Sequence, residues 1–179
     1  MLGIMIIDMQ EKWRKEIPEY LITKQIELIY FAKKNHLPIF TLEYINCEKT
    51  IQELSSILEL VENMYLPKYC DDGFRIIQNP RTKQYHTDVI TNPEEDYECY
   101  KNKLLIQSLN YKKITSIITT GIRKACCYFN TSYGAINEGF KVITSEELTD
   151  CKGIHTQTYR DKFQNHHDTL DELLANINI

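Results

Sequence analysis

Two almost wholly apolar runs constrain the fold of this chain more than any other part of its sequence. The first spans residues 2–7 and ends on Asp8, and the second, within residues 114–120, leads to Gly121. Strands that are covered on both faces have this near-continuous apolar character, whereas a strand with one wet face alternates apolar and polar residues. We therefore expect both runs to be central strands of a parallel sheet.

Shorter β-branched runs alternate with helical periodicity along the rest of the chain, a pattern typical of βαβ units. Together with the two central runs they predict five strands, at residues 2–7, 38–42, 88–91, 114–120 and 141–144. Helices are expected between them, the first ending near Asn35 and the second opening on a capping box formed by Thr50 and Glu53. Later helices are expected around Leu104, Leu105 and Leu109, from about Cys127 to Gly139, and around Leu170, Leu173, Leu174 and Ile177.

The whole chain, residues 1–179, is expected to form one domain, because 179 residues of which 42% are hydrophobic can bury one core without splitting. We predict the α/β class: a three-layer α/β/α arrangement around a mostly parallel sheet of five or six strands in the order 3-2-1-4-5. In that order the first and fourth strands are neighbours, and the winding of the sheet reverses between them.

Charge and hydropathy exclude two classes of partner. A formal net charge of −4, with lysines scattered in short pairs, leaves no basic stripe that could follow phosphates, so no nucleic-acid partner is expected. No apolar run approaches the roughly 18 residues of a membrane helix, so no membrane partner is expected.

The six cysteines show no C-x-x-C spacing and no signal peptide precedes the first strand, which predicts reduced thiols and a cytoplasmic location.

Residues 65–88 form the least regular part of the chain, with Pro67, Gly73 and Pro80 between the predicted second and third strands. Connections of this length inside a compact domain are usually functional lids or arms that contact a partner. A plain surface excursion fits the same sequence equally well.

Asp8 and Cys127 are the candidate catalytic residues. Both follow central strands, and the carboxyl ends of those strands meet at the crevice where doubly wound sheets bind ligands. A thiol at the start of a helix lies near the positive end of the helix dipole and near unpaired N–H groups, which lower its pKa and can receive an oxyanion. Each residue also has a structural interpretation, since free cysteines often fill space and an Asp after a strand often caps a turn.

Two segments resemble the isochorismatase-like cysteine hydrolases, a family that includes nicotinamidases. They are residues 6–10, Ile-Ile-Asp-Met-Gln, and residues 121–131, in which Gly121 lies six residues before Cys127 and Thr131 lies four residues after it. The resemblance implies the three-layer fold and a triad of Asp, Lys and Cys. In this triad, Asp8 accepts a proton and Cys127 attacks a carbonyl substrate.

The resemblance also implies an oxyanion site and an assembly. A cis peptide is implied at Ile122–Arg123, whose amide would join the amide of Cys127 in binding the oxyanion. A homo-oligomer, a dimer or larger, is implied as well. Nicotinamidases bind a metal through an Asp-x-His pair after the second strand, but residues 42–46 contain no histidine. We therefore expect no metal and no cofactor.

The chain departs from the family pattern at the lysine. This residue is implied at the end of the third strand, where the predicted strand 88–91 leads to Asn92. An amide can donate a hydrogen bond but cannot supply a cation, so activation of the nucleophile is expected to be weaker unless another cation substitutes. The candidates are Lys101, Lys103 and Arg123.

Three functions follow as hypotheses. The first is a hydrolase of a small amide, ureido or vinyl-ether substrate, with Cys127 as nucleophile and Asp8 as base. The second is a catalytically impaired relative that binds a ligand or a protein partner, suggested by the missing lysine and the long connection. The third, a general nucleotide-binding domain, lacks both the G-x-G-x-x-G and the G-x-x-x-x-G-K-[ST] motifs.

Overall fold

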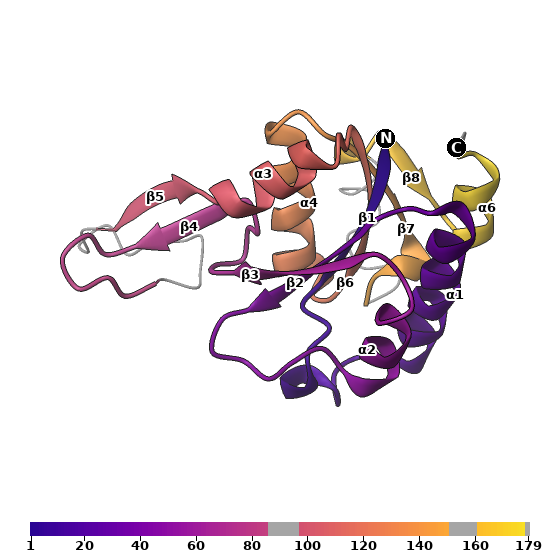
Figure 1. Cartoon of the computed structure of the whole chain (residues 1–179), viewed down its shortest axis with the longest axis horizontal. Helices are drawn as coiled ribbons and strands as arrows, with labels where there is room; N and C mark the ends of the chain where they lie inside the picture. The colour runs from indigo at the N-terminus through magenta and orange to yellow at the C-terminus, as the bar shows by residue number, and fades with distance from the viewer. Residues whose placement is uncertain (86–96, 151–160, 178–179) are drawn as a thin grey trace.

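Six parallel strands form the centre of the molecule, in the spatial order β3-β2-β1-β6-β7-β8 (Figure 1). The computed structural model describes residues 1–85, 97–150 and 161–177. The strands of the sheet are β1 (Leu2–Ile7), β2 (Ile39–Tyr44), β3 (Asn63–Lys68), β6 (Ser116–Gly121), β7 (Lys141–Ser145) and β8 (Asn165–His167). The predicted α/β class and order are confirmed, with β8 as the sixth strand.

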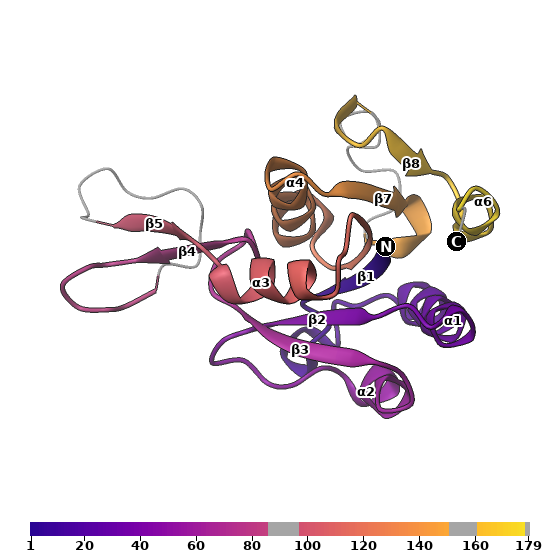
Figure 2. The same cartoon turned by 45° about the horizontal axis from the view of Figure 1, so that its top comes forward.

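Helices cover both faces of this sheet (Figure 2). One face carries α1 (Glu19–Asn35), α2 (Gln52–Leu58) and α6 (Leu170–Ala175). The other face carries α3 (Lys103–Tyr111) and α4 (Phe129–Asn137). Within β1, Ile4 and Ile6 pack with the first set of helices and Met5 and Ile7 with the second, so the expectation of a strand buried on both faces is confirmed.

The predicted helices are all present, but the capping box at α2 is wrong. Ile51 is the N-cap residue of this helix, and no side chain caps it. The Thr50 hydroxyl instead donates to Glu43 Oε1 at 2.9 Å, and Glu53 accepts a hydrogen bond from Arg14 at 2.8 Å. Both side chains therefore join α2 to neighbouring segments rather than to each other.

The third strand of the sheet differs from the prediction. The predicted strand at 88–91 lies outside the described residues. The place beside β2 belongs to β3, whose residues 65–68 fall in the segment predicted as irregular. Pro67 lies in β3, and a proline disfavours assignment to a strand because it cannot donate a ladder hydrogen bond. The edge position of β3 tolerates it, since only one side of this strand pairs.

A two-stranded antiparallel arm projects from the sheet between β3 and α3 (Figures 1 and 2). It consists of β4 (Arg75–Gln78) and β5 (Glu98–Lys101), and every residue of β5 is exposed. Within the described residues, no helix combines the length and apolar character needed to cross a lipid bilayer.

Candidate active site

Asp8 lies where β1 ends, and its backbone turns sharply at this residue. The φ angle of Asp8 is 57°, a left-handed conformation that Asp adopts more readily than most residues because its short side chain can bond locally. The backbone N–H of Asp8 still donates to the Leu42 carbonyl at 3.1 Å. The turn places a buried carboxylate at the carboxyl edge of the sheet, as predicted.

Gly121 brings the end of β6 against the end of β1. Its φ is 140°, and a Cβ at this position would lie 2.1 Å from the carbonyl oxygen of Ile7, so any larger residue would force the two strands apart. The chain then enters a π-helical turn, Lys124–Tyr128, which continues into α4. Cys127 lies in this turn and is therefore delivered to the same edge as Asp8.

Lys68 completes the group, from the last position of β3. Its ammonium donates to Asp8 Oδ2 at 2.7 Å, and the side chains are 0% and 2% exposed. Burial lowers the pKa of Lys68, but the negative charge of Asp8 and the hydrogen bond to it outweigh this effect and raise the pKa, so the lysine stays cationic. Burial raises the pKa of Asp8, against the lowering effects of the Lys68 charge and hydrogen bond.

The structure thus has a buried lysine at the end of the strand beside β2, a position where the sequence interpretation expected none. Asn92, which was aligned with the family lysine, lies outside the described residues. The other candidate cations are engaged elsewhere: Lys101 is exposed and pairs with Glu138 at 2.8 Å, and Lys103 is exposed at the start of α3. Arg123 pairs with Glu16 at 3.0 Å.

The Cys127 thiol is neutral in the resting site, contrary to the predicted lowering of its pKa. Burial raises the pKa of this thiol, and the carboxylates of Asp8 and Asp71 raise it further, while the Lys68 charge opposes them. The sequence could suggest a helix dipole but not two carboxylates facing the sulfur. Ionisation of Cys127 consequently requires a base.

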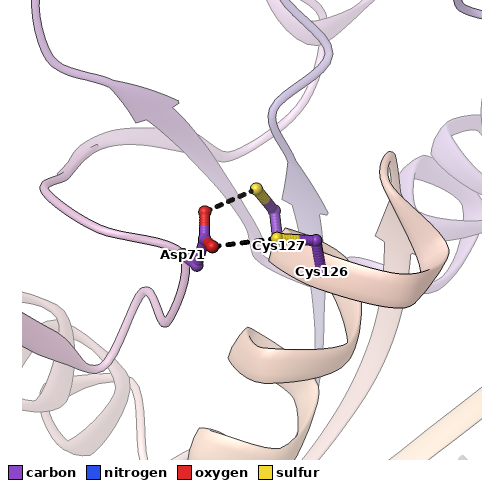
Figure 3. Close-up of side chains that lie close together, drawn as sticks. All are labelled: Asp71, Cys126 and Cys127. Carbon is purple, nitrogen blue, oxygen red and sulfur yellow. Dashed lines mark hydrogen bonds between the residues drawn. The ribbon is translucent and has the colours of Figure 1, made fainter. Parts of the chain in front are cut away.

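Asp71 was missed by the sequence interpretation, although it contacts both cysteines of the turn (Figure 3). The Cys127 thiol donates to its Oδ1 at 3.1 Å and the Cys126 thiol to its Oδ2 at 2.8 Å. Tyr44 donates its hydroxyl to Oδ1 at 2.8 Å. Burial raises the pKa of Asp71, but these hydrogen bonds lower it overall, so the carboxylate stays charged.

Tyr44 and Gln10 support this arrangement from β2 and from the turn after β1. The Lys68 ammonium lies 3.9 Å from the centre of the Tyr44 ring, a favourable cation–π contact in a buried site. The side-chain amide of Gln10 accepts from Tyr44 N at 2.8 Å and donates to the carbonyls of Tyr44 and Glu48. These bonds fix the loop that carries Asp8 against the end of β2.

The implied cis peptide at Ile122–Arg123 is wrong, because the described chain contains no cis peptide bond. The trans form is the one that a peptide bond without proline ordinarily adopts. Ile122 is buried and its N–H donates to the Ile7 carbonyl at 3.2 Å. The side chain of Arg123 lies over the Trp13 ring, 5.8 Å from its centre, at the rim of the site.

A cavity of about 680 Å³ opens onto Cys127 and Asp71. Aromatic side chains form much of its wall, and Lys12 and Arg123 also line it; the aromatic residues are Trp13, Tyr44, Tyr69, Tyr85 and Tyr97. Gln84 and Tyr85 belong to the predicted irregular connection 65–88, so that connection does contribute to the cavity. Its volume suits a small molecule of the size that ligand pockets usually hold.

No protein-family model and no curated protein matches this chain. Solved structures do match it. A nicotinamidase from Staphylococcus aureus has a TM-score of 0.68 at 11% identity, covering 94% of this chain and 98% of that one. N-carbamoylsarcosine amidase from Thermoplasma acidophilum has a TM-score of 0.65 at 11% identity, covering 94% and 95%.

An isochorismatase-like hydrolase from Alkaliphilus metalliredigens has a TM-score of 0.66 at 14% identity, covering 97% of this chain and 98% of that one. Identities this low establish the fold and leave the activity to be argued from the site. The chain therefore has the fold of the isochorismatase-like cysteine hydrolases.

Proposed function

We propose that this protein is a cysteine hydrolase of a small amide, ureido or vinyl-ether substrate. One observation carries the proposal: the buried Lys68–Asp8 ion pair, with 2.7 Å between Nζ and Oδ2, acts electrostatically on the Cys127 thiol, which lines the cavity. A nucleophile, a base and a cation at one buried place supply what acyl transfer requires.

The first half of the reaction forms a thioester. Asp8 takes the proton of the Cys127 thiol as the sulfur attacks the substrate carbonyl carbon, which gives a tetrahedral intermediate. Its C–N bond then breaks, and protonated Asp8 returns the proton to the departing amine. Asp8 Oδ1 accepts no hydrogen bond within the described part of the chain, so this oxygen is available for the proton.

The second half hydrolyses the thioester. Asp8 takes a proton from water as the water oxygen attacks the acyl carbon, the C–S bond breaks, and the thiol of Cys127 is restored by the same proton. Lys68 stays charged throughout the reaction. Its ammonium stabilises the carboxylate of Asp8 and, at the steps where the sulfur is ionised, the thiolate of Cys127. The net reaction converts an amide and water into a carboxylic acid and an amine.

A screen for ammonia release tests the proposal. Small primary amides and ureido compounds are incubated with the wild type, with Cys127→Ala and with Asp8→Asn. We expect release by the wild type and a loss on the order of 10⁴-fold or more in Cys127→Ala, because the nucleophile is gone. Cys99→Ala, at an exposed cysteine of β5, is the matched control. Equal release by Cys127→Ala and the wild type would contradict the proposal.

The impaired relative that only binds a ligand or a partner loses its main argument. That alternative was suggested by the missing lysine and by the long connection 65–88. Lys68 at the end of β3 answers the first argument, and the second fits a wall of the substrate cavity equally well. We therefore do not retain it as a second function.

We also propose that the chain assembles as a homo-oligomer, a dimer or larger. The exposed strand β5, in which the Tyr100 side chain is 45% exposed, offers a surface for such an assembly. Light scattering should give at least twice the mass of one chain, and the mass of a single chain would contradict the proposal.

A further inference from the structure

Three metal-binding groups converge on the wall of the cavity, and the proposed hydrolysis uses only one of them. The Sγ atoms of Cys126 and Cys127 and a carboxylate oxygen of Asp71 all lie within 4.8 Å of one another. Figure 3 shows both sulfur atoms turned toward the same carboxylate, from adjacent positions of the π-helical turn. The proposed mechanism, which uses Asp8, Lys68 and Cys127, assigns no role to the Cys126 thiol beside Asp71.

The spacing of these atoms suits one small divalent ion. Zinc binds thiolates at about 2.3 Å and carboxylates at about 2.0–2.2 Å, which places tetrahedral ligands about 3.5–3.8 Å apart. The two sulfur-to-oxygen distances, 2.8 and 3.1 Å, are shorter than this separation because a thiol proton lies between each pair. An ion that replaces both protons would need only small side-chain rotations.

The charge around the sulfurs also favours a cation. Asp8 and Lys68 form a buried ion pair, so their charges largely cancel. Asp71 carries the remaining charge facing the thiols, and the nearby Lys68 ammonium donates its 2.7 Å hydrogen bond to Asp8. Two soft sulfur donors select a thiophilic ion over magnesium or calcium, which prefer oxygen.

We propose that Asp71, Cys126 and Cys127 bind a thiophilic divalent cation of the Zn²⁺ class. Binding breaks two S–H bonds and forms two metal–sulfur bonds and one metal–oxygen bond, and the two protons go to solvent. No electron is transferred. The fourth position of the ion faces the cavity, which all three side chains line, and water occupies it. The hydroxyl of Tyr44 holds the ligating carboxylate in place at 2.8 Å.

This site is unlike the metal site of nicotinamidases, whose Asp-x-His pair has no counterpart in residues 42–46. Its consequence for catalysis rests on the proposed function: a sulfur bound to the ion is a much weaker nucleophile toward a carbonyl, so the cation acts as an inhibitor. The binding itself does not depend on that function, and the two can be tested separately.

Metal binding is measured first, without any substrate. The full chain, reduced and freed of metal, is titrated with Co²⁺ while the thiolate-to-cobalt absorption is recorded, and with Zn²⁺ against a chromophoric chelator. We expect one ion per chain with a thiolate band. Cys126→Ser and Asp71→Asn should each weaken binding at least tenfold. Cys47→Ser, at a cysteine that lines the same cavity, should bind within twofold of the wild type.

The inference is overturned if the wild type gives no thiolate band, or if Cys126→Ser and Asp71→Asn bind as tightly as the wild type while both melt cooperatively. Loss of binding in Cys47→Ser alone would overturn it as well. With an active substrate in hand, Zn²⁺ should inhibit the wild type and a chelator should reverse the inhibition, with at least tenfold more Zn²⁺ needed for Cys126→Ser. Metal binding without turnover would support this inference and contradict only the proposed hydrolase.

Discussion

The carboxyl edge of the sheet and the projecting arm each contain a lysine–carboxylate pair of nearly the same length. Lys68 and Asp8 lie 2.7 Å apart with both side chains almost fully buried. Lys101 of β5 and Glu138 lie 2.8 Å apart, but the lysine side chain is 61% exposed. Water screens the second pair and not the first, so equal distances have unequal consequences. Burial, rather than the presence of an ion pair, distinguishes the sheet edge from the arm and is what the proposed chemistry requires.

Lys68→Met should have the largest effect. Removing one member of a buried pair leaves an uncompensated charge and costs about 3–5 kcal/mol of unfolding free energy. Turnover should fall about 10²–10³-fold, because Asp8 and the developing charge at the site lose their cation. Urea unfolding and steady-state kinetics measure the two effects.

Lys101→Met is the matched control in the arm. Its unfolding free energy should stay within about 0.5 kcal/mol of the wild type, as is usual for exposed pairs. Turnover should not change. Equal losses of unfolding free energy in Lys68→Met and Lys101→Met would contradict the difference between the two pairs. Full turnover in Lys68→Met would contradict it as well.

Asp72, between the sheet edge and the arm, should give the next largest effect. Burial raises the pKa of this carboxyl from 3.8 to about 6, although its Oδ1 accepts a hydrogen bond from Phe74 N at 2.9 Å. The stability that protonated Asp72 contributes is full below about pH 3.9 and is lost as the pH rises through about 6.

Asp72→Asn keeps the acceptor oxygen and removes the charge. At pH 7.5 this variant should be more stable than the wild type by up to about 3 kcal/mol, the equivalent of the rise in pKa. Below pH 4 the two should be equally stable. Thermal melts between pH 3.5 and 8 test the expectation, and a less stable variant at pH 7.5 would refute it.

The pH dependence of turnover tests how burial and Lys68 change the pKa of Asp8. Asp8 must be ionised to take the thiol proton, and burial raises its pKa while Lys68 lowers it. The acid limb of kcat/KM should therefore lie above the ordinary Asp pKa of about 3.9. In the residual activity of Lys68→Met this limb should move to higher pH, because the lowering effect is lost. A limb that stays in place would show that Lys68 does not act on Asp8.

Tyr85→Ala should have the smallest effect and should concern substrate binding. Tyr85 lines the cavity from the connection between β4 and β5, and its ring lies 4.8 Å from that of Tyr69. Losing this contact should raise KM by about fivefold, equivalent to about 1 kcal/mol, with kcat within twofold. Tyr111→Ala, at a residue that is 79% exposed, is the control. A fall in kcat without a change in KM would place Tyr85 in the chemistry instead.

The sequence was sufficient to predict the central part of the fold. The runs at β1 and β6 are apolar on both faces, which few structures other than central strands of a parallel sheet require. Asp8 comes directly after β1 and Cys127 lies six residues after the end of β6, so the strand order was enough to place both at one edge of the sheet. The start of α4 near Cys127 was also predictable, although a π-helical turn precedes it.

The sequence was not sufficient for features that depend on the edge of the sheet or on contacts between residues far apart in the chain. β3 contains Pro67 and pairs on one side only, so its pattern is weak, and Lys68 was missed with it. Asp71 is more than 50 residues from the cysteines that it contacts, and nothing in the spacing predicts that approach. The direction of the Cys127 pKa depends on this carboxylate and on burial, which is why the predicted direction was wrong.

Trapping the covalent intermediate tests the central claim most directly. An amide substrate found in the screen is mixed with the enzyme, quenched in acid within a turnover, and the digested protein is analysed by mass spectrometry. The account predicts the acyl group on the sulfur of Cys127 in the wild type and no acylated peptide in Cys127→Ala. An acyl group on Cys126, or rapid turnover by an enzyme whose Cys127 is permanently blocked, would contradict it.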